Sequence, residues 1–171
     1  SEILSEPKVQ QNPMSVQLRN LPSLDGPAMT IGVYSFTDKT GQRKPNDTIA
    51  NLSSAVTQGA ESWVIDALLS AGNGAWFEVV ERAGLDNLVK ERQLIRSTRE
   101  NYLTDPEQLQ PMRFAGLILE GGIVGYDSNV STGGIGARYL GIGASTEYRI
   151  DTVTVAMRIV SVETGRVLVS V

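Results

Sequence analysis

The stretch VGYDSNVSTGGIGARYLGIGASTEYRI, residues 124–150, alternates between two kinds of side chain on either side of the Gly133-Gly134 pair. A period of two residues is typical of a β-strand, and a glycine pair supplies the positive φ angles of a tight turn. The stretch therefore predicts a β-hairpin with two unlike faces. The more apolar face holds Tyr126, Val130, Leu140, Ile142 and Tyr148. The polar face holds Asp127, Asn129, Ser131, Ser145, Glu147 and Arg149.

Each arm of this hairpin is longer than the ~9 to 11 residues that a tilted strand needs to cross a bilayer. A membrane β-barrel wall has an apolar face toward lipid and a polar face toward the lumen, as these two faces would provide. One hairpin cannot close a barrel, and unpaired backbone groups in hydrocarbon cost several kcal/mol each. Insertion therefore predicts a ring in which several copies pool their hairpins. A soluble antiparallel sheet with one wet face has the same pattern, so both interpretations stay open.

Glycine is concentrated around the hairpin, because nine of the 17 glycines lie between Gly116 and Gly143. A phosphate-binding loop would need a strand before the glycines and a helix directly after them. No helical pattern follows this segment, so a phosphate site is not favoured.

The composition of the 171 residues is that of an ordinary globular domain, with 41% hydrophobic and 20% charged residues. The formal net charge of −4 gives no electrostatic basis for binding nucleic acid. The sequence has no Cys and no His, which excludes disulfides, thiolate nucleophiles, the usual zinc sites and His-dependent catalysis. Acidic side chains such as Glu61, Asp66, Glu78 and Glu81 are expected to be solvated or paired. We therefore expect no enzyme, no cofactor, no metal site and no nucleic-acid partner.

The chain divides into four parts. Residues 1–27 contain four prolines and no apolar period, which predicts an extended tether. Residues 28–125 predict an α/β domain with a long loop at 42–53. Residues 126–150 form the hairpin, and residues 151–171 return as strands of the domain. The fold class is therefore α/β, or α+β, with a mixed sheet, two main helices and a hairpin.

Local patterns place the elements of this domain. Strands are expected at 28–36, 76–80, 114–119, 151–161 and 167–171. One helix is expected to begin near Ser53, which can cap it, and to end before Gly72. A second helix is expected from Ala83 to about Arg99.

Three segments carry a resemblance to a known family. They are KTGQRKP at 39–45, ERAGLDNLVKER at 81–92 and GARYLGIG at 136–143. Together they resemble the CsgG family, the outer-membrane secretion channel for curli amyloid subunits, from about Leu21 to Val171. The resemblance implies a nonameric ring of lipoprotein protomers in the bacterial outer membrane, each with a periplasmic α/β domain. It implies passage of unfolded amyloid subunits by diffusion, without a cofactor, and two partners, a periplasmic adaptor and a surface assembly factor.

The resemblance also implies a pore constriction within the 42–53 loop. Its lining would be Asn46, Asp47, Thr48, Asn51 and Leu52. An asparagine of the family matches Asn51, whereas Leu52 and Asn46 stand where the family has aromatic residues. We expect an orifice that selects by size and polarity. Without aromatic rings at these two positions, its stacking contacts with a passing chain should be weak. In the alternative interpretation, Asn51 caps the helix that starts near Ser53.

The sequence departs from the family pattern in two ways. In the family a second hairpin and a C-terminal helix follow the position of Val171, and Ser1 stands where the family has a lipid-bearing cysteine. The alternative function is a soluble CsgG-like periplasmic lipoprotein that binds or activates a partner protein. That alternative predicts a monomer that forms no conducting pore.

Overall fold

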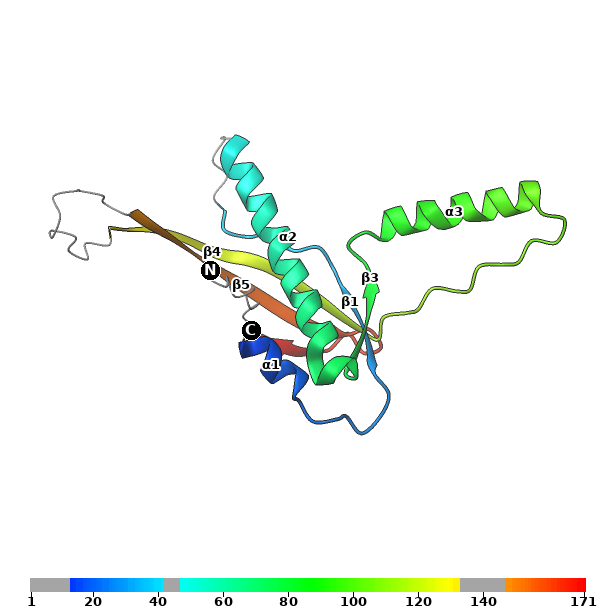
Figure 1. The fold of residues 1–171 in the computed structure, drawn as a ribbon, viewed down its shortest axis with the longest axis horizontal. Helices are drawn as coiled ribbons and strands as arrows, with labels where there is room; N and C mark the ends of the chain where they lie inside the picture. The colour runs from blue at the N-terminus through cyan, green and yellow to red at the C-terminus, as the bar shows by residue number, and fades with distance from the viewer. Residues whose placement is uncertain (1–12, 42–46, 133–146) are drawn as a thin grey trace, which may run out of the picture.

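The computed structural model describes residues 13–41, 47–132 and 147–171, which form an α+β fold around one mixed sheet (Figure 1). The strands are β1 (Met29–Val33), β2 (Thr37–Asp38), β3 (Phe77–Glu81), β4 (Leu117–Thr132), β5 (Glu147–Ser161) and β6 (Val167–Ser170). The helices are α1 (Pro13–Arg19), α2 (Asp47–Ser70), the 3-10 helix η1 (Ala71–Gly74) and α3 (Leu85–Tyr102). The sheet order is β3-β1-β4-β5-β6, and β2 pairs with β4.

The sheet is mixed because its two halves are connected differently. Strand β1 runs parallel to β3 and to β4, whereas β5 is antiparallel to both β4 and β6. Parallel neighbours need a crossover connection, and α2 supplies it between the β1–β2 segment and β3. The predicted mixed sheet with helices is confirmed. Among the described helices, none combines the length and the apolar character that a membrane span requires.

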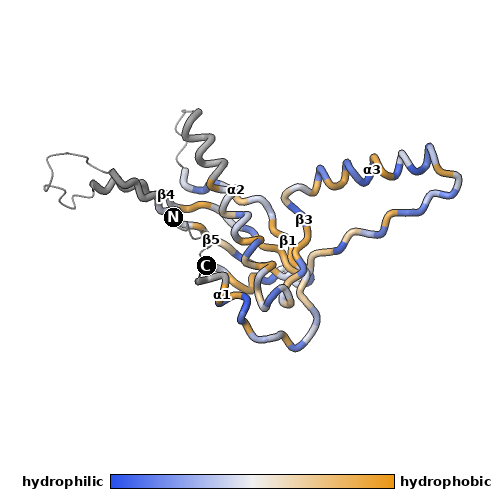
Figure 2. The backbone as a smooth tube through the Cα atoms, viewed as in Figure 1, coloured by the Kyte–Doolittle hydropathy of each residue, from blue (hydrophilic) through white to orange (hydrophobic). Residues whose placement is uncertain are grey.

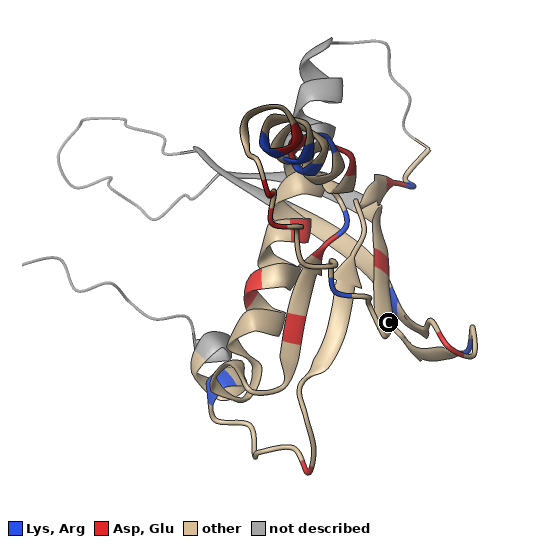
Figure 3. Ribbon diagram, turned by 90° about the vertical axis from the view of Figure 1, so that its right-hand side faces the viewer, with Lys and Arg blue, Asp and Glu red and all other residues tan. Residues whose placement is uncertain are grey.

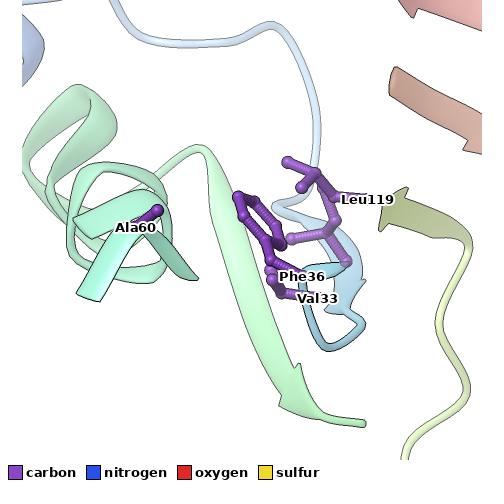
Figure 4. Packing of buried hydrophobic residues seen from close by; sticks show 5 residues of the cluster. Val33, Phe36, Ala60 and Leu119 are labelled. Atoms are coloured by element: carbon purple, nitrogen blue, oxygen red, sulfur yellow. The ribbon is translucent and has the colours of Figure 1, made fainter. Parts of the chain in front are cut away.

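The core lies between α2 and one face of the sheet. Ile31 and Val33 of β1 are fully buried, and Phe36, Ala60 and Leu119 are buried beside them. Figure 4 shows Phe36 next to Leu119, with Ala60 of α2 facing them. Helix α2 adds further contacts through side chains one to two turns after Ala60, namely Val64, Ile65 and Leu68. This packing is the reason for the apolar period that predicted the helix, and Figure 2 shows the apolar strands β1 and β3 beside it.

Three segments differ from the prediction, and the third, the start of α2, is described with the candidate site. Residues 13–19 of the expected tether form helix α1, which packs against η1 and α2. A helix of seven residues is too short to be stable alone, so this tertiary contact explains it. The expected strand at 114–119 and the first hairpin arm are one continuous strand, because β4 runs from Leu117 to Thr132. The expected positions of β1, β3, α3, β5 and β6 are confirmed to within a few residues.

Helix α3 and the extended segment after it form an arm that leaves the sheet (Figure 1). We call residues 85–114 the arm. No residue of α3 is buried, although Leu85, Leu88 and Ile95 are half-buried within the arm. The arm returns to the sheet at Gly116, whose N–H donates to the Thr30 carbonyl oxygen at 2.9 Å. The arm therefore lies outside the buried core of the domain.

Candidate functional site

The predicted hairpin is a two-stranded extension of the sheet. Strand β4 has 16 residues and β5 has 15, and they pair from Leu117 opposite Ser161 to Thr132 opposite Glu147. The inner part of β4 also pairs with β1 and β2, but only as far as Ile123. Beyond that point, β4 and β5 have only each other as strand partners within the described residues. We call this part, residues 125–132 and 147–154, the ribbon.

A β-bulge marks the place where the ribbon leaves the sheet. The register shifts between Ile123, which is opposite Val155, and Gly125, which is opposite Thr154, so Val124 is an extra residue in β4. A bulge bends its strand and increases the local twist. The bulge also changes which residues are opposite each other. Before the bulge, odd-numbered residues of β5 lie opposite odd-numbered residues of β4. After the bulge, odd-numbered residues of β5 lie opposite even-numbered residues of β4. Alternation in the sequence alone does not reveal such a change.

The register at the outer end of the ribbon can be compared with the predicted faces of the hairpin. The Cα partners are Val130 with Arg149 and Ser131 with Tyr148. Each pair joins one residue of the predicted apolar face to one of the predicted polar face, although directly opposite residues share a face. A shift of one residue in register reverses the faces of one arm, so the lipid-facing and lumen-facing assignments stay predictions. Leu140, Ile142 and Ser145 lie outside the described residues.

Two glycines at the base of the ribbon make room for the segment that follows β1. A Cβ atom on Gly121 would lie 2.6 Å from the Phe36 ring, and one on Gly122 would lie 2.9 Å from the Thr37 carbonyl oxygen. Both distances are shorter than ordinary contacts, so side chains are excluded there. The glycine concentration around the hairpin thus has a packing cause at these positions. A Gly-Gly pair inside a strand pattern was the available signal of such a close approach.

One hydrogen bond ties α2 to the base of the ribbon. The backbone N–H of Phe36 donates to Glu61 Oε2 at 3.2 Å, across 25 residues of sequence. Glu61 is half-buried on α2, directly after the buried Ala60. The sequence predicted Glu61 only as a solvated or paired carboxylate. Its partner is instead a backbone group, which no sequence pattern could identify.

The residues predicted to line the constriction lie at the start of α2. The helix begins at Asp47, so the backbone at Asp47, Thr48, Asn51 and Leu52 is helical, and Asn46 lies outside the described residues. The expected loop to residue 53 is therefore too long, and the prediction that Asn51 caps the helix is wrong. No proline or glycine at 46–53 interrupts a helix, and aspartate is favoured at helix N-termini. Positions 48, 51 and 52 have the i, i+3, i+4 spacing that brings positions to one side of a helix.

Two exposed ion pairs brace the strands near the ribbon and the arm. Arg113, at the end of the arm, contacts Glu78 of β3 at 2.8 Å, and Arg158 of β5 contacts Glu120 of β4 at 2.8 Å. The hydrogen bonds from Arg113 lower the pKa of Glu78 below its ordinary value. Both pairs are solvent-exposed, so they add little stability. In Figure 3 the colours mark charged residues on the sheet and on the helices.

Comparison with known proteins identifies close relatives. The family profile described as "Curli production assembly/transport component CsgG" matches residues 10–171. Proteins of that name from Escherichia coli K12, Salmonella typhimurium LT2 and Citrobacter koseri are each 43% identical over 157 residues. The matched region is 90% of this chain and 55% of each relative. The chain thus spans about half the length of the curated relatives.

Proposed function

Since the chain belongs to the CsgG family of curli production assembly/transport components, we propose that it forms an oligomeric secretion pore in the bacterial outer membrane. In this proposal the α+β domain lies in the periplasm and the hairpin at 126–150 enters the membrane. The protomer is a lipoprotein, and the ring is a nonamer. Its cargo is an unfolded amyloid subunit of the curli type. A periplasmic adaptor and a surface assembly factor act with it.

The observation that carries the proposal is the ribbon. Within the described residues, its two outer edges have no strand partner, and it extends from the body of the domain (Figure 1). An isolated two-stranded ribbon is marginally stable, and exposed edges invite pairing with another chain. Pairing each edge with the ribbon of a neighbouring protomer would satisfy the backbone groups and close a wall. A ring of copies would therefore complete the strand pairing that one copy leaves open.

The proposed constriction lies where α2 begins. Asn46, Asp47, Thr48, Asn51 and Leu52 would form successive rings of amide, carboxylate, hydroxyl and aliphatic groups around the pore axis. Such rings select by diameter and polarity and leave the passing chain chemically unchanged. Movement would follow diffusion, with direction set by capture in the periplasm and folding outside. This mode of transport needs no catalytic residue.

A cysteine scan combined with conductance tests the pore. The 171-residue sequence contains no cysteine, so each introduced thiol is unique within it. Single substitutions at Asp127, Ser128, Asn129 and Val130 would be made in the full-length protein, extracted in detergent and placed in planar bilayers. A charged, water-soluble thiol reagent should reduce the conductance of the Asp127→Cys and Asn129→Cys pores but not of the other two. The alternating pattern is expected because lumen-facing and lipid-facing positions alternate along a strand.

Further substitutions locate the constriction. Asn51→Ala and Leu52→Ala should raise conductance and alter secretion, whereas Ser62→Ala, on an exposed part of α2, should change neither. A well-folded protein that never conducts would overturn the proposed pore and support the periplasmic binding module. Conductance with blockage at Ser128 and Val130 instead would keep the pore and reverse the face assignment of this arm.

A further inference from the structure

The arm contains a cleft that has no part in the proposed pore. It has a volume of about 280 Å³ and lies between α3 and the extended segment that follows it. Its lining combines three arginines with two acidic side chains, one amide and two apolar residues. The lining residues are Arg92, Arg96, Arg99, Glu100, Pro106, Glu107, Gln108 and Leu109.

Two of the arginines shape the cleft by holding the extended segment to the helix. Arg92 Nη2 donates to the Gln110 carbonyl oxygen at 2.6 Å, and Arg99 Nη1 donates to the Glu107 carbonyl oxygen at 2.7 Å. Each guanidinium group has five N–H donors, so both keep donors for a further partner. These two hydrogen bonds fix the ends of a short row of arginines along α3.

The arginine between them is free to bind a ligand. Arg96 is exposed and makes no hydrogen bond or ion pair with any other described residue. It lies one turn from both neighbours, because residues three and four apart are adjacent on a helix. A planar guanidinium group matches a carboxylate with two parallel hydrogen bonds. The cleft therefore presents a preorganised donor row with its central member unoccupied within the described chain.

We propose that this cleft binds an acidic polypeptide segment through its carboxylate side chains. Arg92 and Arg96 are separated by about 6 Å along the helix axis, and alternate side chains of an extended chain repeat every ~7 Å. Two alternate acidic residues could thus reach adjacent arginines while Leu109 and Pro106 contact the intervening residue. Glu100 and Glu107 would repel a nucleic-acid backbone, which carries a negative charge at every phosphate. The carboxylates of an acidic polypeptide are spaced further apart, so they can bind the arginines without lying next to Glu100 or Glu107. The inference does not depend on the pore.

Fluorescence anisotropy with a labelled peptide of alternating glutamate and alanine tests this site. The full-length protein in detergent would be compared with its Arg96→Gln variant, which keeps a good helix-forming residue. We expect binding that weakens with added salt and at least threefold weaker binding by the variant, since the variant loses a charged hydrogen-bond donor. Arg96→Lys should lie between the two, because lysine keeps the charge but not the planar fork.

The matched control is Arg166→Gln, which removes the same charge from an exposed turn between β5 and β6. It should bind the peptide like the parent protein. Equal weakening by Arg96→Gln and Arg166→Gln would overturn the site, because it would show only general attraction. Absence of peptide binding by the parent would also overturn it. Equal competition by inorganic phosphate or by a single-stranded oligonucleotide would show a general anion site and contradict recognition of an acidic polypeptide.

Discussion

At the scale of single residues, the base of the ribbon depends on the absence of side chains. Gly121 lies under the Phe36 ring, and Phe36 belongs to the buried core with Val33 and Leu119. A core at normal packing density has no space for an added carbon at such a position. The close approach of strand and aromatic ring therefore requires glycine at 121.

We predict that Gly121→Ala destabilises the protein by about 1 to 3 kcal/mol, since the new methyl group would overlap the Phe36 ring. The measurement is the free energy of unfolding by denaturant. Gly59→Ala is the matched control, because a Cβ atom there meets nothing within 4 Å and the residue lies inside α2. That control should stabilise the protein by up to about 1 kcal/mol through helix propensity.

A double variant separates overlap from other effects of the alanine. Phe36→Leu removes the ring that Gly121→Ala would strike, so the two substitutions together should cost less than the sum of their separate costs. Strict additivity, or equal behaviour of Gly121→Ala and Gly59→Ala, would contradict the packing argument.

At the scale of elements, α2 connects the proposed constriction to the core. Its first residues, from Asp47, include the predicted pore lining, and its middle turn contributes the buried Ala60. Glu61 then joins the helix to the backbone at Phe36, beside the base of the ribbon. The position of the proposed pore lining is thus set by contacts about two to four turns away along the same helix.

We predict that Glu61→Ala destabilises the protein by about 1 kcal/mol and speeds hydrogen exchange at the Phe36 amide, because it leaves a half-covered N–H without its acceptor. Glu61→Gln keeps a side-chain oxygen acceptor and should behave much like the parent protein. Asp66→Ala removes an exposed acidic residue from the same helix and serves as the charge control. If Asp66→Ala matched Glu61→Ala in both measurements, the hydrogen bond would have no special role.

At the scale of the whole molecule, two structures leave the body of the domain in different directions (Figure 1). The ribbon continues the sheet, whereas the arm returns to it through Gly116 and the Arg113–Glu78 pair. The buried cluster lies between α2 and the sheet, and among the side chains that the structure describes it includes none from the ribbon or the arm. The residues that stabilise the fold therefore lie in the core. The surfaces that we assign to assembly and to binding lie on the ribbon and on the arm.

We predict that replacing residues 126–150 with a short glycine-asparagine turn leaves a folded domain that neither forms rings nor conducts. The core cluster stays complete in this variant, so its unfolding temperature should stay within a few degrees of the parent value. Circular dichroism would measure folding, and light scattering after size-exclusion chromatography would measure the size of the assembly. The same turn inserted after Val162, in the exposed β5–β6 connection, controls for the linker itself. Rings that persist without residues 126–150 would show that the ribbon does not hold them together.

The sequence by itself determined the mixed α+β class, the positions of most strands, the second helix and the long hairpin. These features follow from local periodicity and turn residues, which act over a few positions. It also carried the family resemblance, which the comparison confirms. The start of α2 and the short α1 were harder to predict, because element ends are decided by small energies and by contacts elsewhere in the chain.

Only the tertiary structure decided the remaining features. The bulge at Val124, the overlap that requires Gly121 and the acceptor role of Glu61 each arise from segments that meet across the fold. The same holds for the arginine row, whose outer members bind carbonyl groups of the returning segment while Arg96 does not. Register and packing depend on which residues approach one another in space, and a local pattern does not contain that information.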